Sequence, residues 1–108
     1  MSQPTLIKEL YRNKKEVVKD ILSLAFNGRR SLRNKPSLYV DGVKFVAKRI
    51  VLYDSLGNYY CPFCGETGFT RRGIRNHILR RHVDEVFNML IEWIEDKIKW
   101  GFLVAGHR

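Results

Sequence analysis

Two cysteines and two histidines near the middle of the 108-residue chain stand at intervals that restrict what this segment can form. Two residues separate Cys61 from Cys64, twelve separate Cys64 from His77, and four separate His77 from His82. Each interval lies within the range found for zinc ligands, because two thiolates on a tight turn can meet two imidazoles on one helix face at a tetrahedral ion. The spacing therefore predicts one structural Zn²⁺ ion per chain, bound by these four side chains.

The cysteines also have a redox interpretation. The run Cys61-Pro62-Phe63-Cys64 is similar to the redox pair of glutaredoxins, in which the first thiol lies at a helix N-terminus and has a lowered pKa. The glycines that follow, Gly65 among them, disfavour a helix at this point. Redox activity and two free thiols stay open as alternatives to the metal site.

Residues 59–82 resemble the C2H2 zinc finger family. That family has an aromatic residue two positions before the first cysteine, another between the ligand pairs, and an aliphatic residue three positions before the first histidine. Tyr59, Phe69 and Ile74 occupy these places, although Phe69 follows Cys64 by five residues where the family usually has four. The resemblance implies a ββα finger. A single finger in a small basic chain also looks like the single-finger proteins of archaea and their viruses.

The charge of the chain predicts a polyanionic partner. Twenty Lys and Arg against eleven Asp and Glu leave a net charge of +9, concentrated in residues 1–40 and 61–82, whereas residues 83–108 carry more acidic than basic side chains. Such an uneven distribution favours nucleic acid as the partner of the basic zones. The acidic end is expected to stay away from phosphates.

The resemblance implies that Thr70, Arg72, Gly73 and Asn76 occupy the base-reading positions of the finger helix. Asn76 can pair with adenine and Arg72 can contact a base or a phosphate, whereas Gly73 has no side chain to read with, so we expect weak sequence specificity. Further cations beside this helix and in a basic loop extend the predicted contact set. The predicted nucleic-acid-binding residues are Thr70, Arg71, Arg72, Arg75, Asn76, Arg80, Arg81, Arg29, Arg30, Arg33 and Lys35.

The N-terminal half of the chain predicts one helix, a loop and a hairpin. Apolar residues at steps of three and four predict an amphipathic helix over residues 5–26, ending at Asn27 and Gly28. Residues 28–36 are expected to form an exposed basic loop. Strand-forming residues on both sides of an Asp-Gly pair predict a β-hairpin within residues 38–53, with a type I′ turn.

The sequence of the C-terminal half predicts a turn, a strand and one or two helices. A turn over residues 54–58 is expected to lead into a strand at Tyr59 and Tyr60, directly before Cys61. Helical periodicity then runs through residues 71–100, as one helix or as two joined near His82, with an amphipathic C-terminal helix over residues 83–100. Residues 1–108 are therefore expected to form a single domain of the α+β class.

Three functions from different classes follow. The first is a DNA-binding transcriptional regulator that combines the finger with the basic loop, and the second is an RNA-binding protein of ribosomal or viral RNA. Exposed rings among Tyr39, Tyr53, Tyr59 and Tyr60 would favour RNA, because unpaired bases stack on aromatic rings.

The third function is a protein-interaction module, in which zinc only holds the fold. Residues 83–100 would then pair with a partner or a second copy through an apolar stripe, comprising Val86, Leu90, Ile94 and Ile98, and through Trp93 and Trp100. Covering of this stripe by the N-terminal helix within one chain is the competing interpretation.

The sequence disfavours several classes of protein. No paired carboxylates, nucleophile-base pair or phosphate-binding loop is found, and four protein ligands would leave a zinc ion no open position, so we expect neither an enzyme nor a small-molecule substrate. The apolar runs are too short for a membrane span, and the first twenty residues are charged where a signal peptide is apolar. We therefore expect no membrane contact and a location in the cytoplasm or the interior of a host cell, or in the nucleus if the source is eukaryotic.

Overall fold

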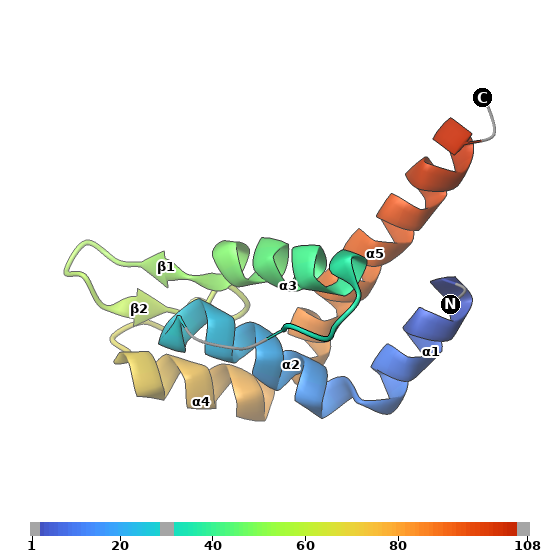
Figure 1. Ribbon diagram of the computed structural model, residues 1–108. Helices are drawn as coiled ribbons and strands as arrows, with labels where there is room; N and C mark the ends of the chain where they lie inside the picture. The colour runs from blue at the N-terminus through green and yellow to red at the C-terminus, as the bar shows by residue number, and fades with distance from the viewer. Residues whose placement is uncertain (1–2, 29–31, 106–108) are drawn as a thin grey trace.

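The computed structural model describes the backbone of residues 3–28 and 32–105, and the surroundings of the side chains of residues 6–28 and 32–99. The fold is mostly helical with a small two-stranded antiparallel sheet, which confirms the α+β class (Figure 1). Its elements are α1 (Gln3–Arg12), α2 (Lys14–Leu22), the π-helical turn η1 (Ser23–Asn27), α3 (Ser37–Ile50), β1 (Leu52–Tyr53), β2 (Tyr59–Tyr60), α4 (Arg71–Arg81) and α5 (Val83–Ala105).

The predicted N-terminal helix is divided into two. The chain bends at Asn13, whose side-chain amide donates a hydrogen bond to the Glu9 carbonyl at 2.9 Å, and α2 starts at the next residue. Past α2 the helix widens into η1 and ends at Gly28, which has a left-handed φ of 69°. The predicted stop at Asn27 and Gly28 is therefore confirmed.

The predicted hairpin of residues 38–53 is wrong, since residues 38–50 belong to α3 and only Leu52 and Tyr53 form a strand. The buried α3 residues Tyr39, Val43, Val46 and Ile50 recur at helical spacing, and this buried face outweighs the local turn preference of the Asp-Gly pair. Gly42 does not adopt a positive φ. It serves close packing instead, because a Cβ atom at this position would lie 2.6 Å from Cδ1 of Leu90 on α5.

The sheet takes only the last two residues of that segment, Leu52 and Tyr53, as its first strand. β1 and β2 pair with Leu52 opposite Tyr60 and Tyr53 opposite Tyr59. The turn between them is closed by a hydrogen bond from the Gly57 amide to the Asp54 carbonyl at 3.0 Å. The predicted turn over residues 54–58 and the strand at Tyr59 and Tyr60 are confirmed.

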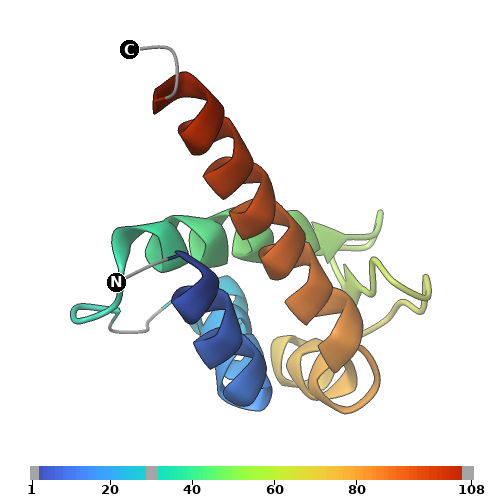
Figure 2. The same ribbon diagram turned by 90° about the vertical axis from the view of Figure 1, so that its right-hand side faces the viewer.

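Helix α5 packs across α2 and α3, and its C-terminal part extends beyond them (Figures 1 and 2). Val86, Leu90 and Ile94 are completely buried in this contact. The apolar stripe considered as a dimer surface is thus largely covered within one chain, by α2 from the predicted N-terminal helix and also by α3, which was not predicted to cover it. Pairing through the remaining surface of residues 83–100 stays a prediction.

One hydrophobic core joins the helical body to the segment that carries the cysteines and histidines. Cys61, Ile74 and Ile78 belong to the same buried cluster as the apolar residues of α2, α3 and α5. The segment 59–82 is therefore anchored to the rest of the protein rather than attached by a linker. Among the described helices, none combines the length and the apolar character that crossing a bilayer requires.

Candidate functional site

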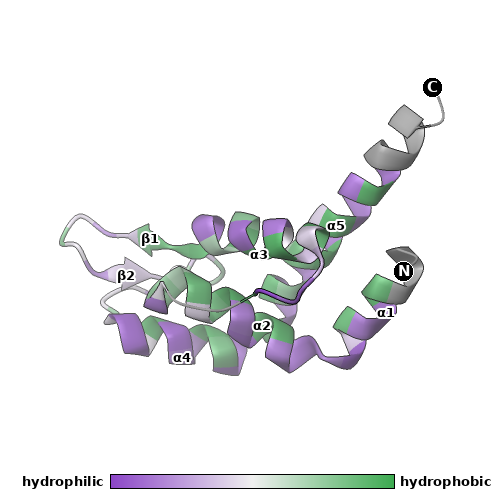
Figure 3. Cartoon of the chain, in the orientation of Figure 1, coloured by the Kyte–Doolittle hydropathy of each residue, from purple (hydrophilic) through white to green (hydrophobic). Residues whose placement is uncertain are grey.

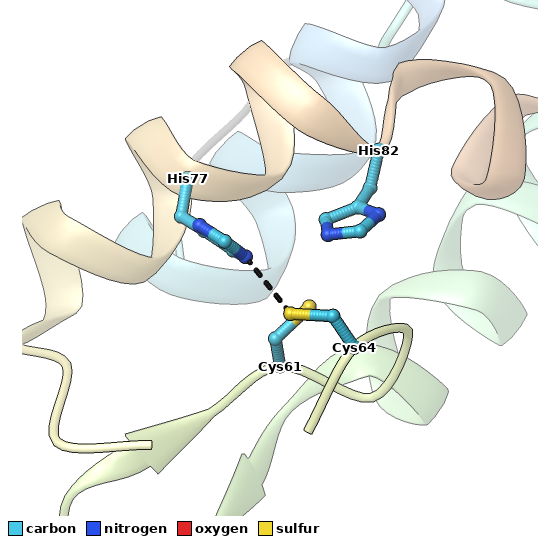
Figure 4. A group of neighbouring side chains, drawn as sticks. All are labelled: Cys61, Cys64, His77 and His82. Carbon is cyan, nitrogen blue, oxygen red and sulfur yellow. Dashed lines mark hydrogen bonds between the residues drawn. The ribbon is translucent and has the colours of Figure 1, made fainter. Parts of the chain in front are cut away.

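The two cysteines lie on a tight turn directly after β2. The amide of Gly65 donates to the Cys61 carbonyl at 2.9 Å, and the amide of Cys61 donates to the Glu66 carbonyl at 2.8 Å. Gly65 has a φ of +80°, a conformation that costs a residue with a side chain more than it costs glycine. This turn places both thiols on the side that faces α4 (Figure 4).

The two histidines come from α4 and its end. Thr70 caps the helix, its hydroxyl accepting a hydrogen bond from the Gly73 amide at 3.1 Å, and Ile74 and Ile78 anchor the helix in the core. His82 follows the last residue of α4 and still donates its amide to the Ile78 carbonyl at 2.8 Å. The chain then leaves the helix at His82, which confirms two helices joined at this residue.

The structure brings all four predicted ligands together. The sulfur atoms of Cys61 and Cys64 and the ring nitrogens of His77 and His82 lie within 4.8 Å of one another, and Sγ of Cys64 is 3.4 Å from Nε2 of His77 (Figure 4). Bonds of about 2.0–2.3 Å to a central ion place tetrahedral ligands roughly 3.3–3.8 Å apart. Small side-chain rotations would bring the widest pair into this range, so the cluster could bind a metal ion.

The surroundings of His82 test whether the four side chains suit a metal ion. Its Nδ1 lies 2.6 Å from a carboxylate oxygen of Glu85, which accepts a hydrogen bond from it, so in the neutral ring the free lone pair is on Nε2. Nε2 is buried and makes no hydrogen bond within the described part of the chain. A buried acceptor without a donor is costly, whereas a metal ion beside the two thiols would satisfy it.

The two thiols differ in acidity. Burial raises the pKa of Cys61, whereas the backbone amide of Glu66 lowers the pKa of Cys64, which is exposed. Burial also acts to lower the pKa of His82, but its interactions with Glu85 and Cys64 outweigh this and leave the pKa raised. A metal ion requires thiolates and unprotonated Nε2, so binding would release protons.

Aromatic residues enclose the cluster. Phe69 packs against the His77 ring with centroids 4.7 Å apart, and Phe63 stacks on His82 at 5.3 Å. Phe69 also exchanges two backbone hydrogen bonds with Tyr59, at 3.0 and 3.1 Å, which pairs the chain before α4 with β2. The extra residue between Cys64 and Phe69 thus does not prevent this ring from covering the ligands.

The polar residues of α4 form one exposed face. Arg72, Asn76 and Arg80 are exposed and four residues apart, on the side of the helix away from buried Ile74 and Ile78. Figure 3 shows α4 as a largely hydrophilic helix. Within the described residues, none of the arginines of this helix forms an ion pair with a carboxylate. We call Arg72, Asn76 and Arg80 the exposed face of α4.

Other predicted contact residues gather at the start of the same helix. Thr70, Arg71, Arg72 and Arg75 line a hollow of about 510 Å³ together with Asn27, which comes from η1. The Nε atom of Arg75 is buried and has no hydrogen-bond partner among the described residues. We call this feature the arginine hollow. Arg81, by contrast, is simply exposed near the end of the helix.

The basic loop does not join this surface where the structure describes it. Lys35 lies over the ring of Tyr39 and lines a different hollow with Glu9 and Glu16. Figure 2 shows the turn that carries Arg33 and Lys35 on the other side of α2 from α4. Arg29 and Arg30, also predicted to contact nucleic acid, lie outside the described residues.

Sequence reasoning missed two partners of the site. Glu85 follows His82 by three residues in the first turn of α5, and an acidic residue at that spacing was the available signal. Asn27 gave no comparable signal, because only the tertiary structure brings η1 beside the start of α4.

No family model, no curated protein and no solved structure matches this chain. The resemblance of residues 59–82 to C2H2 fingers therefore rests on the ligand spacing and on the arrangement of the four ligand side chains. The functional proposal rests on the same geometry and on the exposed face of α4.

Proposed function

We propose that this protein is a nucleic-acid-binding protein stabilised by one zinc ion, and that it acts as a DNA-binding transcriptional regulator. The observation that carries the proposal is the exposed face of α4, whose arginines have no carboxylate partner in the described part of the chain. Unpaired guanidinium groups aligned along a helix suit the phosphates and base edges of a nucleic-acid groove.

Zinc is the metal that this donor set suits best. Two sulfur and two nitrogen ligands in a closed tetrahedron are typical of structural zinc, and they leave no position for water or a substrate. The ion would hold the turn of Cys61 and Cys64 against α4. Its role is therefore to fix the helix that carries the proposed contacts.

The contact surface suits DNA because α4 is a single helix with one open side. A helix is about 10–12 Å across and the major groove of DNA is about 12 Å wide. A lone finger covers about three base pairs, and Gly73 lies partly buried beside Thr70 and Phe69 without a side chain to read a base. Phosphate contacts should therefore dominate affinity.

The proposal predicts steeply salt-dependent binding to duplex DNA. The double variant Arg72→Ala and Arg80→Ala should bind at least about tenfold more weakly at moderate salt, and its log-log salt slope should fall by about one for each phosphate that the variant no longer neutralises. Fluorescence anisotropy across a salt series measures both quantities.

The matched control removes two exposed cations from another helix. Lys44→Ala with Lys48→Ala changes the net charge equally on α3, away from α4, and should leave the affinity within about twofold. Absence of duplex binding by the wild type, or equal losses of affinity in the two double variants, would contradict the proposal.

A second prediction concerns the partner of His82. Glu85→Ala removes the acceptor that orients the ring, so Zn²⁺ affinity should fall about 10–100-fold, as is typical when such outer partners are removed. Competition with a chromophoric chelator measures this. Glu92→Ala removes an equal charge from an exposed position of the same helix and should have no effect. Equal affinities of the two variants would show that Glu85 does not position the ligand.

A further inference from the structure

Tyr53 is an exposed aromatic residue that the proposed duplex contact does not use. It is 56% exposed at the end of β1, whereas Tyr39 is only 3% exposed and Tyr59 and Tyr60 are half-buried. Of the four tyrosines expected near a sheet, Tyr53 thus presents the most open ring. An exposed ring of this size is available to a ligand with a flat aromatic surface.

The ring of Tyr53 is held in place from behind. Tyr53 lies opposite Tyr59 in the sheet, with ring centroids 4.8 Å apart, and Tyr59 packs edge-on against buried Phe26 at 5.5 Å. The turn after Tyr53 is also fixed, because Asp54 accepts hydrogen bonds from the amide of Asn58 at 3.0 Å and the hydroxyl of Thr67 at 2.5 Å. The open side of Tyr53 is therefore a preorganised surface.

The arginine hollow starts directly after the segment that pairs with the other edge of β2. The same sheet register that pairs Tyr53 with Tyr59 pairs Tyr59 with Phe69, which precedes Thr70 at the edge of the hollow. Arg71 lines the hollow, and its positive charge acts to lower the pKa of Tyr53.

The Tyr53 hydroxyl stays neutral in this setting. A hydrogen bond with Tyr59 is the main reason that its pKa is raised, the charge of Tyr59 and burial add to this, and Arg71 opposes it. The phenol therefore brings no negative charge near a phosphate at neutral pH.

The lining of the hollow indicates the charge of its ligand. Three arginines and two neutral polar residues line it, with no carboxylate among them. An anion that accepts several hydrogen bonds would satisfy these donors, and a phosphodiester is such a group. An aromatic surface together with an anion site matches the two halves of a nucleotide.

We propose that Tyr53 and the arginine hollow bind one nucleotide of a single-stranded nucleic acid, with its base stacked on Tyr53 and a neighbouring phosphate in the hollow. Bases inside a duplex are already stacked on their neighbours and cannot cover the ring, whereas an unpaired base has a free face. This inference rests on the proposed nucleic-acid binding and adds to it the class of strand that this part of the surface takes.

The test compares three labelled probes of equal length: single-stranded DNA, single-stranded RNA of the same sequence, and the corresponding DNA duplex. Tyr53→Ala should weaken binding of at least one single strand about fivefold or more, in the range found for loss of one base stack, and change duplex binding less than twofold. Tyr53→Phe keeps the ring and should restore single-strand binding. The two single-stranded probes decide whether DNA or RNA is the better ligand.

The matched control is Tyr11→Ala, because Tyr11 is 53% exposed but lies on α1. It should bind all three probes like the wild type. Arg75→Ala should weaken single-strand binding and reduce its salt slope by about one. Zinc content and the thermal unfolding midpoint of every variant verify the fold.

The outcomes separate this inference from the proposed function. A wild type that binds the duplex but neither single strand, or a Tyr53→Ala variant that loses duplex and single-strand affinity equally, would overturn the nucleotide subsite alone. A wild type that binds none of the three probes would overturn the proposed function together with it.

Discussion

Cys64→Ser is expected to abolish stoichiometric Zn²⁺ binding and to unfold residues 59–82. Metal binding supplies about 10–16 kcal/mol of apparent folding free energy in finger peptides, as much as the whole stability of an ordinary domain. Apart from buried Cys61 and the bridge between Tyr59 and Phe69, the turn that carries the cysteines is held only by the two-stranded sheet before it and by short hydrogen-bonded loops. This is the largest effect that we expect from a single substitution.

The unfolding should be local first. Ile74 and Ile78 belong to the common core, but α2, α3 and α5 also bury one another without the metal ligands. Hydrogen exchange should therefore show reduced protection in residues 59–82, with protection in the helical body retained at low temperature. Lowering the pH should weaken metal binding in the wild type, because the thiolates and imidazoles become protonated.

Elemental analysis and native mass spectrometry measure the zinc content. His107→Ala, which removes the only histidine outside the cluster, is the control and should retain one zinc ion per chain. The metal site would be refuted by a wild type that is purified without metal and still shows full protection over residues 59–82.

The metal cluster could be predicted from sequence because its geometry is mostly local. Cys61 and Cys64 share one turn and His77 and His82 share one helix and its end, so their spacing already limits where the side chains can meet. The residues around the cluster were harder to predict from sequence than its four ligands. Asn27 and the ring of Tyr53 become relevant only through contacts between elements, which spacing does not encode, whereas Glu85 follows His82 by three residues and its spacing was visible in the sequence.

The wrong prediction of a hairpin over residues 38–53 also arose because the sequence does not reveal contacts between elements. An Asp-Gly pair between strand-forming residues is a strong local signal for a hairpin, yet the chain uses it inside a 14-residue helix. Tyr39, Val43, Val46 and Ile50 were all visible as apolar residues, and they suit either interpretation until the partner surface is known. Packing against α5 favours the helix over the hairpin, and it needs a small residue at position 42.

Gly42→Leu is expected to lower the free energy of unfolding by on the order of 3 kcal/mol, at the upper end of the range for overpacked cores. A Cβ atom at this position would lie 2.6 Å from Cδ1 of Leu90 and 3.0 Å from the ring of Trp93, and leucine adds three further carbons. α3 and α5 would have to separate, although theirs is the most extensive contact between elements of the described fold. Denaturant unfolding with saturating Zn²⁺ measures the change.

The neighbouring residue provides the control that separates close packing from turn formation. Asp41 is exposed on α3, so Asp41→Ala should change stability by at most about 0.7 kcal/mol, and in the favourable direction, because alanine has the higher helix propensity. In a type I′ turn both substitutions would be harmful, since both positions there need a positive φ. A large loss of stability for Gly42→Leu together with a neutral or stabilising Asp41→Ala would therefore show that Gly42 serves the contact with α5. Equal losses of stability at the two positions would instead mean that residues 41 and 42 act as a turn and that this helix contact is wrong.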